Sequence, residues 1–169
     1  TLLACISPGP DFALVSRNSL LLSRRTGVLT AAGIGLGVVV HVCYTVLGLG
    51  LVLQHSLWLF SALKMTGAAY LIYLGIKMLG TMPAIGQFAT PAAAQSDIAA
   101  LRTGFLTNAL NPKTSIFIVS LFIGVVRPET TLPMQIAYGV FISAAHITWF
   151  SFVAMFFSTG QIRGKLIAV

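Results

Sequence analysis

Charged residues are what this sequence has least of. Asp, Glu, Lys and Arg together make up 8 % of the 169 residues, and only three of them are acidic. A soluble domain carries roughly a quarter charged residues. Hydrophobic residues make up 57 % of the chain and the mean hydropathy is +0.94. This composition excludes an ordinary soluble domain and indicates an integral membrane protein.

Basic residues outnumber acidic ones, but they form no run. The net charge of +7 comes from ten Lys and Arg against Asp11, Asp97 and Glu129. The basic residues stand singly or in pairs at the ends of apolar segments, whereas nucleic-acid binding would need basic clusters interleaved with aromatic side chains. We therefore expect no nucleic-acid partner and interpret the basic residues as determinants of membrane topology.

Groups for redox, metal or covalent chemistry are also scarce. The two cysteines, Cys5 and Cys43, both lie in apolar segments and predict small core side chains without a disulfide framework. Neither His41 nor His146 has a second histidine or cysteine at helical spacing, so the pattern predicts no metal site. No nucleophile stands at a recognisable spacing from a base, which argues against an enzyme, and we expect no cofactor.

Long apolar segments dominate the chain instead. A membrane-crossing helix needs about 20 predominantly apolar residues. Five segments qualify or nearly do, which predicts an all-α polytopic membrane helix bundle: residues 2–22, 28–53, 57–79, 104–126 and 135–158. The first segment is short for a span and opens on threonine, so we expect the start of this helix and a sixth span to lie outside the given sequence; the alternative is a protein with five spans.

The positions of Lys and Arg in the short connections predict which side of the membrane each connection faces. The first connection carries Arg24 and Arg25, the third is flanked by Lys77 and Arg102, and the second and fourth are poorer in positive charge. Since positively charged loops stay on the cytoplasmic side, the odd-numbered connections are predicted to be cytoplasmic. The third has loop composition, and we interpret residues 80–103 as a flexible cytoplasmic linker between two halves.

Proline interrupts two of the apolar segments beside a charged residue. One interruption is Ser7-Pro8-Gly9-Pro10-Asp11 and the other is Asn111-Pro112-Lys113. Proline removes a backbone donor and clashes with the preceding turn, so the polar backbone groups freed inside the bilayer need another partner. A matched pair of such breaks points to the substrate site of a secondary transporter.

The two interrupted segments also predict an internal repeat. Each continues into a second helix that carries a histidine about thirty residues past the proline, His41 in the first half and His146 in the second. Because a repeat unit of three spans has an odd number of crossings, its second copy has the opposite orientation in the membrane. This gives the inverted three-plus-three repeat used for alternating access. We therefore assign residues 1–79 to a first repeat and residues 104–169 to a second repeat whose third span is missing.

The charged residues at the breaks suggest a site for a zwitterion. A charge in a bilayer costs several kcal/mol unless it finds water or a partner. Asp11 would hold a substrate ammonium or a proton and Lys113 a substrate carboxylate; the structural alternative is a static ion pair between them. Freed amides attract carboxylates and freed carbonyls attract ammonium groups, so amino acids are natural candidates. The predicted substrate-binding residues are Ser7, Pro8, Gly9, Pro10, Asp11, Asn108, Asn111, Pro112 and Lys113.

Neutral and titratable side chains near the breaks complete the predicted site. Thr114 would add hydrogen bonds alongside the asparagines, unless these residues act only as helix caps. Histidine titrates near neutral pH, so His41, His146 and Asp11 are candidates for proton coupling. The alternative for each histidine is a buried neutral imidazole bonded to a neighbouring carbonyl.

Four motifs occur in order along the chain. The first, at residues 8–19, is Pro-Gly-Pro-Asp-Phe with a following Arg-Asn-Ser, and the other three are longer blocks at residues 24–41, 63–75 and 104–113. Together they resemble the homoserine and threonine resistance family of the lysine exporter superfamily, over nearly the whole chain. The resemblance implies a bacterial inner-membrane exporter, surrounded by lipid, that exchanges an amino acid such as threonine or homoserine for protons. It also implies six spans, and it leaves open whether the protein forms a homodimer.

Two other functions stay open as alternatives. A metal-ion exporter of related architecture would need more soft or carboxylate ligands than Asp11, two histidines and two separated cysteines provide. A non-transporting membrane scaffold would use the region around Asp11 for structure alone. A transporter and a scaffold predict different results for Asp11→Asn. In a transporter the substitution abolishes export while protein levels stay intact, whereas loss of the protein would support a structural role.

Overall fold

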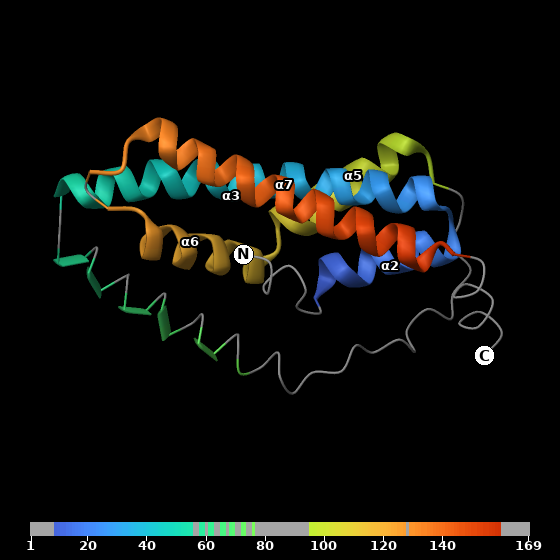
Figure 1. Cartoon of the computed structure of the whole chain (residues 1–169), viewed down its shortest axis with the longest axis horizontal. Helices are drawn as coiled ribbons and strands as arrows, with labels where there is room; N and C mark the ends of the chain where they lie inside the picture. Colours follow the sequence, from blue (N-terminus) through green and yellow to red (C-terminus); the bar gives the residue numbers. More distant parts are fainter. Residues whose placement is uncertain are drawn as a thin grey trace.

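The computed structural model describes residues 9–55, 95–127 and 129–159, together with isolated positions between 58 and 76. Within these residues every regular element is a helix, which confirms the all-α prediction. The helices are α2 (Pro10–Leu21), α3 (Arg24–His55), α5 (Asp97–Ala109), α6 (Pro112–Val125) and α7 (Leu132–Phe157) (Figure 1).

Among the described residues, two helices are individually long and apolar enough to cross a bilayer. They cover Arg24–Gly48 within α3 and Leu132–Phe157, with 25 and 26 residues and a mean hydropathy of 1.8 in each. Candidate spans therefore overlap the predicted spans at residues 28–53 and 135–158. The predicted span at residues 57–79 lies largely outside the described residues. The count of six spans, the inverted repeat and the division into two repeats stay predictions.

The predicted span at residues 104–126 is broken in its middle. α5 and α6 meet at an angle of 60°, with the break at Asn111 and Pro112. Pro112 cannot continue α5 because it lacks a backbone N–H, but it suits the first turn of a new helix. Asn111 is the N-cap of that helix, and its side-chain oxygen accepts a hydrogen bond from the Lys113 N–H at 3.0 Å. This confirms the second predicted break.

At the first predicted break the structure shows the beginning of a helix. α2 begins at Pro10, and Gly9 is its N-cap in extended backbone conformation. Asp11 lies in the first turn of α2, where the positive end of the helix dipole favours a carboxylate. Ser7 and Pro8 lie outside the described residues.

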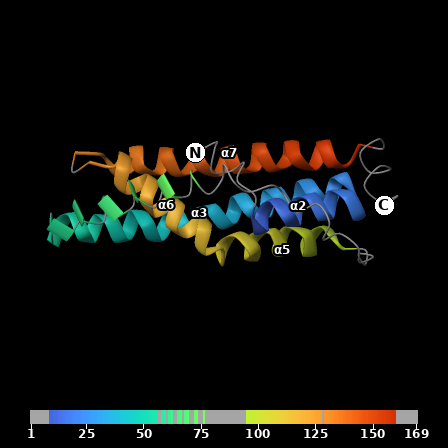
Figure 2. The same cartoon turned by 90° about the horizontal axis from the view of Figure 1, so that it is seen from below.

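Three helix ends lie near the middle of the bundle. α3 and α7 run antiparallel along its length, whereas α2 and α5 occupy one half and α6 the other (Figures 1 and 2). The start of α2, the end of α5 and the start of α6 therefore meet at about the mid-level of the two long helices. This is the level at which the substrate site of a secondary transporter lies.

Glycine allows α3 and α5 to approach backbone to backbone. A Cβ placed on Gly33 would lie 2.1 Å from the Leu101 carbonyl oxygen, and one on Gly104 would lie 2.1 Å from the Thr30 carbonyl oxygen. Small residues of this kind permit close helix contacts inside membranes. A Cβ on Gly37 would lie 2.8 Å from the Asn108 Cβ, so the same close contact brings the end of α5 against the middle of α3.

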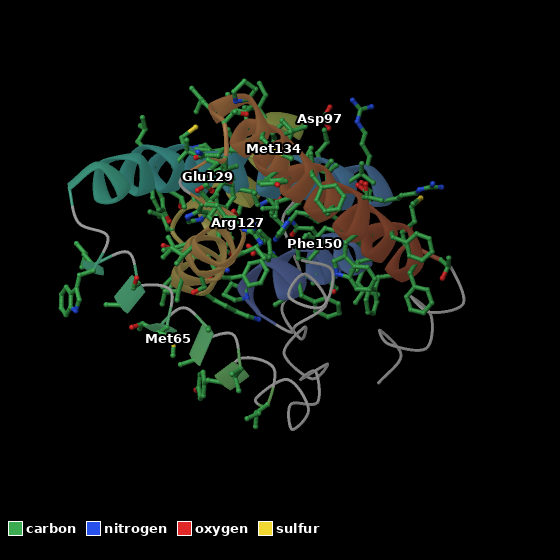
Figure 3. All side chains as sticks on the ribbon, turned by 60° about the vertical axis from the view of Figure 1, so that its left-hand side comes forward. Met65, Asp97, Arg127, Glu129, Met134 and Phe150 are labelled. Carbon is green, nitrogen blue, oxygen red and sulfur yellow. The ribbon has the colours of Figure 1, made fainter. Side chains whose placement is uncertain are left out.

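In the part of the chain that the structure describes, apolar side chains pack in two clusters, one joining α3, α6 and α7 and the other joining α2, α3 and α7. Phe150 belongs to the second cluster and lies among interior side chains, whereas Asp97 lies at the periphery (Figure 3). The prediction that Cys43 is a core residue is wrong, because its side chain is exposed. Cys43 follows the buried Val42, and one residue turns a helix by about 100°, which directs Cys43 away from the first cluster. Cys5 lies outside the described residues.

The end of the predicted linker is helical. α5 begins at Asp97, so residues 97–103 do not form the flexible segment expected from their composition. Ser96 is the N-cap, and its hydroxyl oxygen accepts a hydrogen bond from the Ala99 N–H at 3.2 Å. Asp97 adds a favourable negative charge to the first turn. Residues 80–94 lie outside the described residues.

Candidate functional site

Asp11 is the centre of a buried polar cluster formed by three helices. Its side chain is 7 % exposed. Its Oδ2 atom accepts hydrogen bonds from Asn108 Nδ2 of α5 at 2.9 Å and from Asn111 Nδ2 at 3.1 Å. The Thr114 hydroxyl of α6 lies 3.4 Å from the same oxygen. The residues predicted at the two proline breaks, about a hundred positions apart in the sequence, therefore meet in the structure.

The two oxygens of the Asp11 carboxylate have different surroundings. Oδ2 has these three neutral donors, whereas Oδ1 is buried and has no hydrogen-bond partner among the described residues. Burying an ionised carboxylate is costly unless its lone pairs are satisfied. Oδ1 is thus a buried acceptor able to bind an ammonium group or a proton.

The helix ends give the site a polarity. α2 and α6 both begin here, and the positive ends of their helix dipoles favour negative charge. α5 ends here, and its last carbonyl groups favour positive charge. The break between α5 and α6 therefore presents both an anion-favouring end and a cation-favouring end at one level, as recognition of a zwitterion would need.

Asn108 connects the two sides of this arrangement. It is 0 % exposed, and its side-chain nitrogen contacts Asp11 and, at 3.3 Å, the Thr114 hydroxyl oxygen. Its backbone oxygen accepts hydrogen bonds from Asn111 N–H and from the His41 ring, both at 2.8 Å. Asn108 Oδ1 is buried and has no partner among the described residues. One residue of the broken helix thus contacts a carboxylate and an imidazole.

His41 lies in the middle of α3 and is 1 % exposed. Because a carbonyl oxygen can only accept, His41 Nε2 carries the hydrogen shared with Asn108. The other ring nitrogen, Nδ1, lies 2.7 Å from the Tyr44 hydroxyl, which in turn lies 2.6 Å from Ser115 Oγ. Sequence reasoning did not identify Tyr44 or Ser115. The spacing of three residues between His41 and Tyr44 on a helix could have pointed to the first.

His146 lies in α7 and is 4 % exposed. Its Nδ1 donates a hydrogen bond to the Ile142 carbonyl oxygen at 2.8 Å, and its ring lies 6.3 Å from the Phe150 ring. Both predicted histidines are thus buried and bonded to a backbone carbonyl, as the structural alternative requires. Their role in proton coupling stays a prediction.

The remaining predicted site residues lie close to the same level. Gly9 and Pro10 form the start of α2, and Pro112 and Lys113 form the first turn of α6. The Lys113 side chain is half-buried. The predicted roles of Asp11 in binding a substrate ammonium and of Lys113 in binding a substrate carboxylate stay predictions.

A second polar contact, which sequence reasoning also missed, lies further along α2. Asn18 and Thr30 are both 0 % exposed, and Asn18 Nδ2 donates to Thr30 Oγ1 at 2.9 Å. Asn18 follows Asp11 by two helical turns and so lies on the same face of α2. Thr30 Oγ1 also donates to the Thr26 carbonyl oxygen at 2.7 Å. Buried polar residues therefore extend from Asp11 towards the end of the bundle where α3 begins.

Comparison with known proteins places this site in a family. Residues 2–166 match the LysE type translocator family. The chain is 32 % identical to the threonine efflux protein of Escherichia coli K12 over 171 residues, which cover 96 % of this chain and 80 % of that protein. It is 34 % identical to the homoserine/homoserine lactone efflux protein of Salmonella typhimurium over 133 residues, covering 79 % and 62 % of the two chains.

Relatives without an assigned substrate show the same likeness. The chain is 31 % identical to the uncharacterized membrane protein YrhP of Bacillus subtilis over 157 residues, covering 88 % of this chain and 75 % of that protein. No solved structure matches the chain significantly. The extent of the family match shows that the chain belongs to the LysE type translocator family, so it is a multi-span membrane transport protein and not an enzyme.

Proposed function

We propose that this translocator exports a small neutral amino acid, such as threonine or homoserine, across the bacterial inner membrane in exchange for protons. The observation that carries the proposal is the Asp11 carboxylate, which is buried where three helix ends meet and keeps one oxygen without a partner among the described residues. The names of two similar proteins, a threonine efflux protein and a homoserine/homoserine lactone efflux protein, support the choice of substrate class.

The substrate ammonium binds Asp11 Oδ1 in this proposal. Three neutral donors hold Oδ2 and so orient the carboxylate, while Oδ1 stays available. The substrate carboxylate binds at the N-terminal end of α6, where the helix dipole and Lys113 favour an anion. Ser7, Pro8, Gly9 and Pro10 would border the same pocket from the start of α2.

Alternating access moves the bound amino acid across the membrane. Two inverted halves rock about the broken helices, so that the site opens first to the cytoplasm and then to the outside. A proton on Asp11, His41 or His146 resets the carrier, because a protonated Asp11 no longer holds an ammonium group. Asp11 thus binds the substrate and the proton in turn.

The first experiment measures efflux of a panel of labelled amino acids from cells that produce the protein, with and without a protonophore. Asp11→Asn removes the charge and keeps the shape. A hydrogen bond to a charged group is worth about 1.5–3 kcal/mol, so efflux of the preferred amino acid should fall at least about tenfold at unchanged protein level. The matched control is Asp97→Asn, since Asp97 is a carboxylate at the bundle's periphery with a side chain 52 % exposed.

Three results would contradict parts of the proposal. Efflux that is indifferent to the protonophore would exclude proton exchange. Loss of the Asp11→Asn protein from the membrane, with normal amounts of the Asp97→Asn protein, would favour a structural role for Asp11. Failure of every amino acid in the panel to leave the cells faster than from cells without the protein would exclude the substrate class.

A further inference from the structure

Three side chains form a continuous hydrogen-bonded chain that ends at the candidate site. Ser115 Oγ of α6 lies 2.6 Å from the Tyr44 hydroxyl, and the Tyr44 hydroxyl lies 2.7 Å from His41 Nδ1 in α3. His41 Nε2 then lies 2.8 Å from the Asn108 carbonyl oxygen. Every link is within normal hydrogen-bond length. The bond between Tyr44 and Ser115 joins α3 to α6 away from the residues at the proline breaks.

The acceptor at the inner end fixes the direction of every bond in this chain. Nε2 must carry a hydrogen because the Asn108 carbonyl only accepts. In the neutral ring Nδ1 is therefore an acceptor, so Tyr44 donates to His41 and Ser115 donates to Tyr44. All three donors point inward, and the neutral chain is ready to pass a proton towards His41.

The two hydroxyl-bearing members of this chain are more exposed than the imidazole. Tyr44 is 41 % exposed, Ser115 is half-buried, and His41 is 1 % exposed. The chain therefore starts at the surface of the described bundle and ends at an imidazole inside it. Such a path is what a buried proton-binding group needs, since His41 itself has almost no contact with its surroundings outside the protein.

We propose that Ser115, Tyr44 and His41 form a proton-transfer chain that loads one proton from hydronium onto His41. A hydronium ion gives a proton to Ser115 Oγ and leaves as water, the Ser115 proton moves to the Tyr44 oxygen, and the Tyr44 proton moves to His41 Nδ1. Three bonds to hydrogen form and three break, so the net change is one proton moved from hydronium to the imidazole. This inference rests on the proposed function and names the residues through which its protons enter.

The surroundings of His41 connect its protonation to the candidate site. The ring faces the carbonyl end of α5, where the helix dipole favours a cation. Tyr44 on α3 contacts the ring directly, His146 on α7 interacts with it electrostatically, and Asp11 on α2 is linked to it through Asn108. Lys113 lies in the first turn of α6. Asn108 contacts His41 through its backbone and Asp11 through its side chain. Protonation of His41 and binding at Asp11 therefore act on one shared residue.

The test separates proton coupling from substrate movement in proteoliposomes. Threonine counterflow at equal pH measures movement alone, and threonine uptake driven by an acidic interior measures coupling. Tyr44→Phe keeps the ring and removes the relaying hydroxyl. The ratio of gradient-driven uptake to counterflow should fall at least about tenfold, as expected when a positioned proton-transfer group is removed. Ser115→Ala should lower the ratio in the same direction.

A matched control distinguishes the chain from a general effect of removing a hydroxyl. Tyr138→Phe makes the same change in α7, where Tyr138 is a partly buried residue packed against the first apolar cluster. The ratio for Tyr138→Phe should equal that of the unaltered protein. A Tyr44→Phe protein with an unaltered ratio would overturn the proton-transfer chain and leave the proposed function standing.

A spectroscopic measurement tests the chain independently of transport. If the unaltered protein shows no threonine counterflow, the proposed function fails for that substrate, and nitrogen-15 NMR of the histidine side chains in lipid nanodiscs still reports on the chain. Signals of His41 are assigned by their loss in His41→Gln. Tyr44→Phe should shift the Nδ1 signal and slow exchange of the His41 ring protons with water. Unchanged Nδ1 shift and exchange would overturn the inference.

Discussion

Asn108 donates a hydrogen bond to Asp11 across 97 positions of sequence, with 2.9 Å between its side-chain nitrogen and the carboxylate Oδ2. This contact joins the end of α5 to the beginning of α2 in the middle of the bundle. Because Asn108 is fully buried and also bonds His41, it cannot move without disturbing both the carboxylate and the imidazole. We therefore expect Asn108 and Asp11 to act as one unit.

Removal of the Asn108 side chain tests this relationship. Asn108→Ala takes one donor from a buried carboxylate and is expected to destabilise the protein by about 1–3 kcal/mol. In a double-mutant cycle with Asp11→Asn, the second substitution should cost less than it does alone, because the interaction is already lost. Thermal unfolding of the four purified proteins in detergent measures the cycle. Strictly additive effects would show that the contact contributes nothing.

The close contact between α3 and α5 gives a second prediction. In Gly104→Ala the new Cβ would lie 2.1 Å from the Thr30 carbonyl oxygen, so the helices must separate. The clash is with backbone and cannot be relieved by a side-chain rotation, and we expect destabilisation of about 3 kcal/mol or more. The amount of folded protein in membranes, measured by fluorescence-detected size-exclusion chromatography, should fall sharply.

Gly48, in the long helix α3, provides the control for this substitution in α5. A Cβ at Gly48 meets no atom within 4 Å among the described residues. Alanine favours helix over glycine by about 1 kcal/mol, so Gly48→Ala should leave the protein unchanged or slightly more stable. Equal yields of the Gly48→Ala and Gly104→Ala proteins would refute the inferred backbone contact.

The buried pair Asn18 and Thr30 gives a third prediction. Thr30→Val keeps the shape of the side chain but removes the acceptor of the Asn18 hydrogen bond. A buried donor without a partner costs about 1–3 kcal/mol, so the melting temperature should fall. Asn18→Leu combined with Thr30→Val should restore part of the loss, because replacing both partners by apolar groups removes the unsatisfied donor. A double variant less stable than either single variant would contradict this explanation.

The sequence predicted the parts of the site that follow from local geometry. Proline cannot continue a helix wherever it stands, so the break at Pro112 and the helix start at Pro10 could be located without any knowledge of packing. The meeting of Asp11 with Asn111 followed from pairing the two breaks. The match between sequence and structure is therefore closest where one residue type dictates the backbone.

Contacts that depend on the rotation of one helix against another could not be predicted in this way. Tyr44 and Ser115 touch because α3 and α6 face each other at one angle, and hydropathy does not reveal that angle. The exposure of Cys43 has the same origin. The helix at residues 97–103 could have been predicted from local sequence, because Ser96 followed by Asp97 is a common helix start. The polar composition of this segment led to the prediction of a flexible linker instead.

The predicted sidedness of the membrane can be tested with single cysteines. Asp97 begins α5 and pairs with Arg25 near the start of α3, with 2.5 Å between Arg25 Nη2 and Asp97 Oδ2, so both residues lie at the end of the bundle predicted to be cytoplasmic. Glu129 lies in the connection between α6 and α7, at the opposite end. In a protein without Cys5 and Cys43, a membrane-impermeant maleimide applied to intact cells should label Glu129→Cys and not Asp97→Cys.

The Asp97→Cys substitution is suitable for this measurement because little depends on the pair that it breaks. The side chains of Arg25 and Asp97 are 77 % and 52 % exposed, and exposed ion pairs contribute about 0–1 kcal/mol. Folding and orientation should therefore be unaffected, and labelling after permeabilisation should reach both cysteines equally. Labelling of Asp97→Cys, but not of Glu129→Cys, in intact cells would reverse the assigned orientation. The cytoplasm would then face the opposite end of the bundle, and the sidedness inferred from the Lys and Arg distribution would be wrong.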